Sequence, residues 1–157
     1  MAVPTVKTVL GEVDPSKLGR TLTHEHLSMR FDVAYTPAGP GEVPSCETMP
    51  FTLQNSGWIR QFPYAHKDNI ILNDKSSEEA VLESVSAFAS AGGGALVENS
   101  TVGLKRKSSF LREVSRQTGV HIVAGTGYYV GGAQSTETIE KVNLKISIDI
   151  SIHLIIT

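Results

Sequence analysis

The sequence predicts an α/β protein with a parallel sheet. Short apolar runs at residues 94–99 and 121–126 have the length of buried strands, and an amphipathic helix at 108–118 separates them. A second amphipathic helix, at 76–91, precedes the first of these runs. Because strands and helices alternate along the chain, the strands are expected to lie parallel to one another.

The N-terminal elements are short. Residues 5–13 alternate enough to form a strand or one arm of a hairpin. Asp14 is then placed to cap a single helical turn, with Pro15 at its first position and Gly19 at its end. The apolar run that follows predicts the first central strand at 20–26.

A long irregular loop is predicted after this strand. Residues 34–50 contain four prolines and two glycines, which prevent regular structure. Long loops at the carboxyl end of a strand in a parallel sheet commonly contact substrate, and a plain connecting loop is an equal alternative here.

The two helices have recognisable ends. In the helix at 76–91, Ser76 and Glu79 have the spacing of a capping box, and Gly92 is placed to end the helix. The second helix is expected to end at Gly119 for the same reason.

Composition restricts the possible partners. The formal net charge is −2 and charged residues make up 19% of the 157, so the sequence indicates no nucleic-acid or anionic-membrane partner. The basic cluster at 105–107 is interpreted as a solvated approach to a helix. A single cysteine, Cys46, excludes an internal disulfide and suits a reducing compartment. With no apolar leader and no run of eighteen apolar residues, the sequence predicts a soluble, cytoplasmic protein.

The most informative stretch is the hexapeptide Thr-Leu-Thr-His-Glu-His at 21–26. At the end of a strand, His24 and His26 point to one side and Glu25 to the other. Neutral imidazole is the commonest protein ligand for zinc and its neighbours. This geometry fits a metal site at the end of the strand, with His24 and His26 as candidate ligands, and a chance occurrence of the His-x-His spacing is the alternative.

This hexapeptide, followed by Leu27, resembles the opening metal motif of the phosphotriesterase family within the amidohydrolase superfamily. Segments 6–13, 92–99 and 118–130 also resemble the phosphotriesterase-related proteins of animals, so that the resemblance covers residues 5 to about 138. It implies a TIM (β/α)8 barrel, of which this chain would supply the first three βα units.

The length leads to a further expectation about domains. A (β/α)8 barrel takes about 250 residues, so 157 residues cannot close one, and the chain is expected to be an N-terminal fragment. Residues 1–140 would form the barrel part and residues 141–157 a divergent tail. Within that tail, positions 142–154 alternate strictly between apolar and polar, where the family pattern would place a helix.

The resemblance also implies a cofactor and site residues. Two zinc ions per complete barrel would activate a bridging hydroxide as nucleophile. His24 and His26 match the two first-strand histidines that bind the more buried ion, and the other ligands come from later strands. Tyr129 matches a tyrosine that lines the substrate pocket, with a merely buried aromatic as the alternative. Glu98 and Asn99 end the second strand, where barrel function concentrates, and hydrogen bonding to backbone groups is an equal alternative for Asn99. The sequence assigns no catalytic residue.

Together these features predict a zinc-dependent hydrolase that acts on a small molecule: a phosphotriester, an ester, a lactone or an N-acyl amide such as N-acyl taurine. A homodimer of the full-length parent is a further expectation. The alternative is a catalytically inactive truncated isoform, which either binds a partner through its exposed sheet edge or is degraded.

Overall fold

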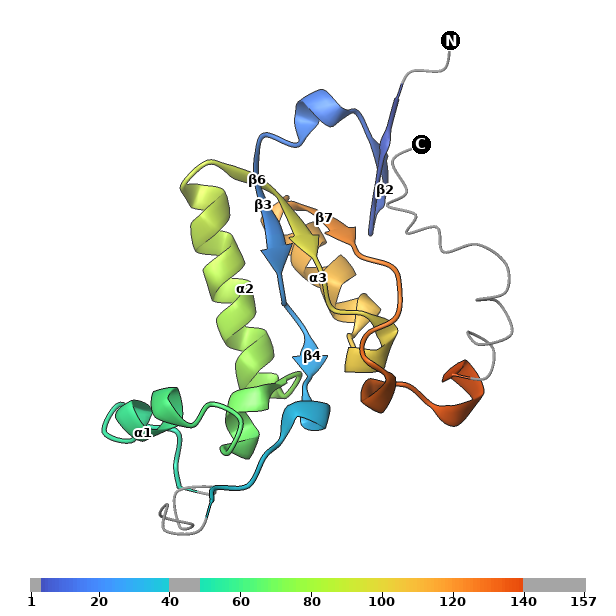
Figure 1. Ribbon diagram of the computed structural model, residues 1–157. Coiled ribbons are helices and arrows are strands. Elements are labelled where there is room, and N and C mark those ends of the chain that lie inside the picture. Colours follow the sequence, from blue (N-terminus) through green and yellow to red (C-terminus); the bar gives the residue numbers. More distant parts are fainter. Residues whose placement is uncertain (1–3, 40–48, 140–157) are drawn as a thin grey trace.

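The computed structural model describes residues 4–39 and 49–139, and a three-stranded parallel sheet lies at its centre (Figure 1). The strands are β3 (Arg20–Glu25), β6 (Gly93–Glu98) and β7 (His121–Ala124), in the order β3-β6-β7. This arrangement confirms the predicted parallel α/β class. Because the strands run parallel, their carboxyl ends lie together at one end of the sheet, where β/α folds place their functional residues.

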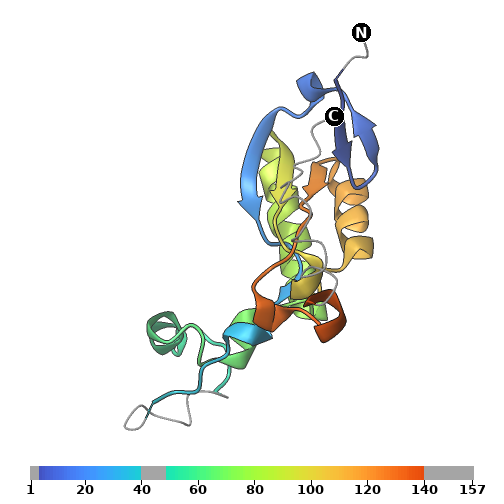
Figure 2. The ribbon, with the colours of Figure 1, turned by 45° about the vertical axis from the view of Figure 1, so that its right-hand side comes forward.

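Two helices cover one face of this sheet (Figures 1 and 2). Helix α2 (Lys75–Ser90) packs against β6, helix α3 (Ser108–Thr118) packs against β7, and the helices contact each other. The core lies between these helices and the sheet, because the apolar side of each amphipathic helix faces the strands. Its buried residues are Leu27, Val85, Leu96, Phe110, Leu111, Val114, Val120 and Ile122.

The observed helix boundaries test the helix ends that were predicted from capping residues and glycines. Helix α3 has the predicted bounds and ends at Gly119, which has a positive φ of 73°. The predicted capping box of α2 is wrong: Asp74, not Ser76, caps this helix, and its Oδ1 accepts the backbone N–H of Ser77 at 2.9 Å. The carboxylate of Asp74 also accepts the Ser77 hydroxyl at 2.9 Å, so an earlier and better acceptor places Ser76 inside the helix.

The N-terminal residues form both arms of a hairpin, where the sequence predicted a strand or one arm of a hairpin. Strand β1 (Val6–Thr8) pairs antiparallel with β2 (Gly11–Val13). The N–H of Val9 donates to the carbonyl of Ile122 at 2.8 Å, which ties the hairpin to β7. Asp14 caps the single turn that follows, as expected, by accepting the N–H of Ser16.

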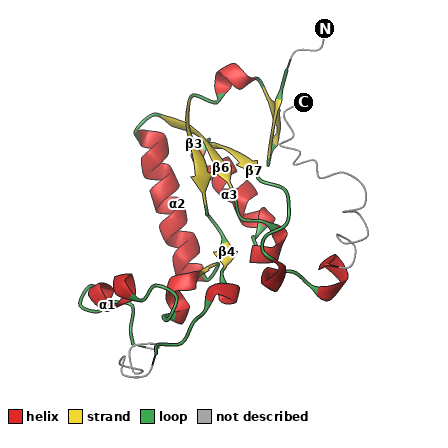
Figure 3. Ribbon diagram, viewed as in Figure 1, coloured by secondary structure: helices red, strands yellow, loops and turns green. Residues whose placement is uncertain are grey.

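The connection from β3 to α2 contains elements that the sequence did not predict. Strand β4 (Met29–Arg30) pairs antiparallel with β5 (Ile71–Leu72), beyond the carboxyl end of β3 (Figure 3). Helix α1 (Ser56–Gln61) lies in the same connection. The middle of the predicted long loop, including Cys46, and the alternating tail lie outside the described residues. Among the described helices, none has the length and apolar character that a membrane crossing needs.

Candidate metal centre

The two candidate ligands lie side by side at the carboxyl end of β3. The ring centroids of His24 and His26 are 5.3 Å apart, with an angle of 71° between the ring planes. The ring of His24 is exposed and that of His26 is half-buried. Zinc binds imidazole nitrogens at about 2.0–2.1 Å, so two rings this close are compatible with one shared ion.

One nitrogen of His26 already has a partner. The Nδ1 atom lies 2.9 Å from the Oγ of Ser100, which follows β6. The ring nitrogen that remains free to bind a metal is therefore Nε2. A hydrogen bond to the second nitrogen is a usual feature of metal-binding histidines, because it fixes the orientation of the ring.

A buried carboxylate supports this contact. Glu98 is the last residue of β6 and is completely buried. Its Oε2 accepts the backbone N–H of Leu27 at 2.5 Å, and its Oε1 accepts that of Ser100 at 3.0 Å. One carboxylate thus holds both the residue after His26 and the residue that contacts the His26 ring.

The loops after β6 and β7 are joined by a guanidinium group. The Nη1 of Arg106 donates to the carbonyl of Ser100 at 2.8 Å and to that of Gly125 at 2.6 Å. Arg106 is half-buried, so the interpretation of the cluster at 105–107 as a solvated approach is wrong for this residue. Three basic residues in a row indicate exposure, but the fold turns the middle one inward, where two carbonyl oxygens offset its desolvation.

The residues present fit part of a zinc site. A structural tetrahedral site has four protein ligands and a catalytic one commonly has three, whereas this strand end supplies two imidazoles. In residues 4–39 and 49–139, no three His, Cys, Asp or Glu side chains are grouped closely enough to hold a metal ion. His24 and His26 are therefore candidates for half of a site that needs further ligands.

Tyr129 lies in the segment after β7. Its ring packs edge-to-face on that of Phe31, with centroids 5.7 Å apart, and Phe31 also contacts Tyr64 at 6.2 Å. The side chain of Tyr129 is 38% exposed, so it is not the buried aromatic considered as an alternative. Its role in a substrate pocket stays a prediction.

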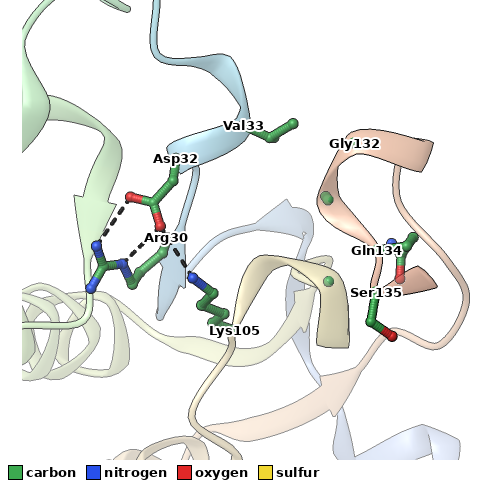
Figure 4. Close-up of a pocket in the computed structure, with 9 residues that line it drawn as sticks. Arg30, Asp32, Val33, Lys105, Gly132, Gln134 and Ser135 are labelled. Carbon is green, nitrogen blue, oxygen red and sulfur yellow. Dashed lines mark hydrogen bonds and ion pairs between the residues drawn. The ribbon is translucent and has the colours of Figure 1, made fainter. Parts of the chain in front are cut away.

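A separate cavity of about 420 Å³ opens between the segments that follow β3, β6 and β7 (Figure 4). Asp32 lies in its wall and accepts hydrogen bonds from Arg30 at 3.0 and 3.1 Å and from Lys105 at 3.3 Å. The hydrogen bonds from Arg30, and to a smaller extent the one from Lys105, hold the pKa of Asp32 below its usual range. The lining residues are Arg30, Asp32, Val33, Gly103, Lys105, Gly132, Ala133, Gln134 and Ser135. The candidate ligands and Tyr129 are not among them.

The fold is that of a parallel β/α protein, with its candidate site at the carboxyl ends of the strands. The sequence comparison is more specific, because a match to the phosphotriesterase family covers residues 4–148. The chain belongs to this family. Metal dependence is general in the family, and its characterised members include hydrolases.

Similar proteins agree with this assignment. The chain is 47% identical to N-acetyltaurine hydrolase of Homo sapiens over 133 residues, and 50% identical to that of Mus musculus over 134 residues. Each match covers 85% of this chain but 37% of the relative, so the chain spans little more than a third of these proteins.

Solved structures give the same picture of the fold. A resiniferatoxin-binding protein from Rhodobacter sphaeroides superposes with a TM-score of 0.80 at 31% identity, over 86% of this chain and 37% of that one. Organophosphorus hydrolase from Deinococcus radiodurans gives a TM-score of 0.57 at 25% identity, over 92% and 36% of the two chains. The described residues therefore correspond to about a third of a phosphotriesterase-type TIM barrel, as predicted.

Sequence reasoning identified the histidine pair and noted Glu98, but it missed Ser100 and Arg106. A signal for Glu98 was available, since a carboxylate at the end of an apolar strand is an unusual residue to bury. No local signal pointed to Ser100, because its partner is 74 residues away in the sequence.

Proposed function

We propose that this chain supplies the first part of the active site of a metal-dependent hydrolase, with His24 and His26 as two ligands of a zinc ion. The observation that supports this most is the pair of rings 5.3 Å apart at the carboxyl end of β3, with Nδ1 of His26 already hydrogen-bonded. This is where β/α barrels place catalytic residues, and the arrangement leaves Nε2 of His26 for the metal.

The residues of this chain would orient the ion rather than perform the bond cleavage. A zinc ion held by His24 and His26 would lower the pKa of a bound water molecule to near neutral and would polarise the carbonyl or phosphoryl group of the substrate. Ser100 holds the His26 ring, and Glu98 holds the backbone beside it. The remaining ligands, including those for a second zinc ion, would come from further strands of a complete barrel.

The proposed substrate is a small N-acyl amide, with N-acetyltaurine as the leading candidate. Relatives that bear the name N-acetyltaurine hydrolase are 42–50% identical to this chain, whereas the organophosphorus hydrolase is 25% identical. Phosphotriesters and lactones are the second choice. Tyr129 would form part of the wall of the substrate pocket.

A chimera tests both the ligands and the substrate. The segment of human N-acetyltaurine hydrolase that aligns with this chain, 133 residues long, is replaced by the matching residues of this chain. We expect the chimera to hydrolyse N-acetyltaurine and His24→Ala to reduce the rate to background. His121→Ala is the matched control, because His121 begins β7 at the opposite end of the sheet. Unchanged turnover in His24→Ala would refute the metal assignment.

Metal binding by the 157-residue chain provides a second test. Co²⁺ titration should show weak binding, because two imidazoles make up half of a tetrahedral site. We expect His24→Ala and His26→Ala to abolish this binding and His121→Ala to leave it unchanged. The chain alone is expected not to hydrolyse N-acetyltaurine, a lactone or a phosphotriester above background, and turnover by this chain would contradict the division of the site between early and late strands.

A second candidate function is an interaction fragment without catalysis. One observation favours it: the residues of β3 from Arg20 to His24 are exposed, and β3 is an edge strand of its sheet. Exposed edge strands can recruit other chains. Size-exclusion chromatography of the chain, with and without residues 141–157, distinguishes the cases. Self-association that the deletion abolishes would support the interaction fragment and the proposed division of the chain after residue 140.

A further inference from the structure

We infer that Ser100 and Glu98 are positioning residues that select the tautomer of His26 with its hydrogen on Nδ1 and its lone pair on Nε2. The consequence for metal binding depends on the proposed function, whereas the tautomer is a property of this chain by itself. Neither residue would touch the substrate, so both act through His26.

The first step of the argument is the chemistry of a neutral imidazole. One nitrogen carries a hydrogen and the other a lone pair, and only the lone pair can bind a metal. The Oγ of Ser100 lies 2.9 Å from Nδ1 of His26. When Nδ1 donates its hydrogen to this oxygen, the lone pair is on Nε2 and a metal can bind there.

The second step decides which group donates. A serine hydroxyl can either donate or accept, so the distance alone leaves both directions open. Glu98 is completely buried, and its two oxygens accept the N–H groups of Leu27 and Ser100. Leu27 follows His26 in the sequence, and Ser100 contacts the His26 ring. The Glu98 side chain thus acts as an acceptor beside this contact, and an acceptor favours hydrogens over lone pairs on the side that faces it. It therefore favours the arrangement in which Nδ1 presents its hydrogen to Ser100.

The third step is the rigidity of the hydroxyl. The N–H of Ser100 is held by Glu98 at 3.0 Å, and its carbonyl is held by Arg106 at 2.8 Å. In addition, the N–H of Asn99 donates to the carbonyl of Glu25 at 2.8 Å. Hydrogen bonds thus fix the backbone on both sides of the contact. They place the Oγ of Ser100 beside Nδ1 of His26 without any contribution from a metal.

His24 serves as an internal reference. Within the described part of the chain, its ring contacts that of His26 but its nitrogens have no hydrogen-bond partner. The two histidines lie at the same end of β3, yet only His26 has a hydrogen-bond partner that could select a tautomer. A change that acts through Ser100 should therefore alter His26 and spare His24.

The test is a long-range ¹H–¹⁵N correlation spectrum of the ¹⁵N-labelled, metal-free chain, at a pH where both rings are neutral. We expect His26 to carry its hydrogen mainly on Nδ1. In Ser100→Ala it should shift to the Nε2–H form, which free imidazole side chains prefer, while Ser100→Thr should keep the original tautomer because it retains the hydroxyl. Glu98→Gln should shift the ratio in the same direction as Ser100→Ala, by a smaller amount.

The matched control is Ser115→Ala. Ser115 is also a buried serine with one hydrogen bond, to the carbonyl of Val120 at 2.7 Å, but it lies in α3 away from His26. A loss of folding would alter the whole spectrum and both histidines. An unchanged His26 tautomer in a folded Ser100→Ala chain, or an equal shift in His24, would overturn the proposal.

Metal affinity separates this proposal from the proposed function. Loss of a hydrogen bond to a metal ligand typically weakens binding about 10–100-fold, and we expect a loss of this size for Co²⁺ in Ser100→Ala. If the tautomer shifts as expected but His24→Ala leaves the turnover of the chimera unchanged, the positioning role stands and the metal assignment fails. If Co²⁺ binds equally in both chains and the tautomer does not change, the positioning role fails and the metal assignment stands.

Discussion

The two strands that form the candidate site are neighbours, but they are stabilised in different ways. Leu22 of β3 and Leu96 of β6 are paired in register, yet the first is 43% exposed and the second 2% exposed. Strand β6 has a strand on each side and lies on the core, whereas β3 is at the edge and most of its side chains face solvent. The strand with the candidate ligands is therefore positioned mainly by backbone and carboxylate hydrogen bonds near its carboxyl end.

The leucine pair gives the largest expected effect. Leu96→Ala should lower the free energy of unfolding by about 2–5 kcal/mol, because it leaves a cavity in the core. Leu22→Ala should change it by about 0.5 kcal/mol, as is typical of exposed positions. Urea unfolding followed by circular dichroism measures both. Equal losses would mean that β3 has an apolar support of its own, contrary to the comparison.

The glutamate pair tests the polar support of β3. Glu25 and Glu98 are also paired in register, but only Glu98 is fully buried and accepts two backbone N–H groups. Glu98→Ala should cost about 1–3 kcal/mol, because it leaves buried donors without partners. Glu25→Ala should cost about 0.5 kcal/mol or less. Hydrogen exchange of the Leu27 and Ser100 amides would locate the effect, and unchanged protection at both would contradict this assignment.

The N-terminus of α2 offers a smaller test, on the helix that covers β6. Asp74→Ala should cost about 1 kcal/mol, because the N-cap acceptor for Ser77 is lost. Ser76→Ala should be close to neutral, since Ser76 lies inside the helix rather than at its cap. Thermal unfolding of both variants distinguishes the observed cap from the capping box that the sequence suggested, and a larger loss in Ser76→Ala would restore the latter.

The smallest effect is expected from the ion pairs of Asp32, one with Arg30 in the same segment after β3 and one with Lys105 in the segment after β6. Hydrogen bonds from Arg30 and Lys105 lower the pKa of Asp32 from its ordinary value of 3.8. A depressed carboxyl pKa contributes stability above the unfolded pKa, and this contribution is lost as the pH falls through the lower folded value.

Asp32→Asn should therefore reduce stability at pH 7 by less than about 1 kcal/mol, because the group is 43% exposed and the pair is screened by solvent. The difference from the wild type should shrink below pH 4. Urea unfolding at pH 7 and at low pH measures this difference. A gap that widens toward low pH would mean that Asp32 is stabilised as the neutral acid.

Local patterns in the sequence determined the class of fold. Helix α3 begins and ends where its periodicity and Gly119 place it, because helix signals depend on residues within a few positions of one another. The hexapeptide at 21–26 likewise indicated the candidate ligands, since strand geometry puts residues two positions apart on one side, while its resemblance to a family motif indicated the family.

Only the tertiary structure decided how these ligands are held. Leu27, one of the two partners of Glu98, is 71 residues away from it along the chain, and Ser100 is 74 residues away from His26, and no periodicity relates such positions. The same holds for the β4–β5 pair and for the inward turn of Arg106. Burial of a polar group depends on which partners the fold brings near it, and that information exists only after β3, β6 and β7 have paired.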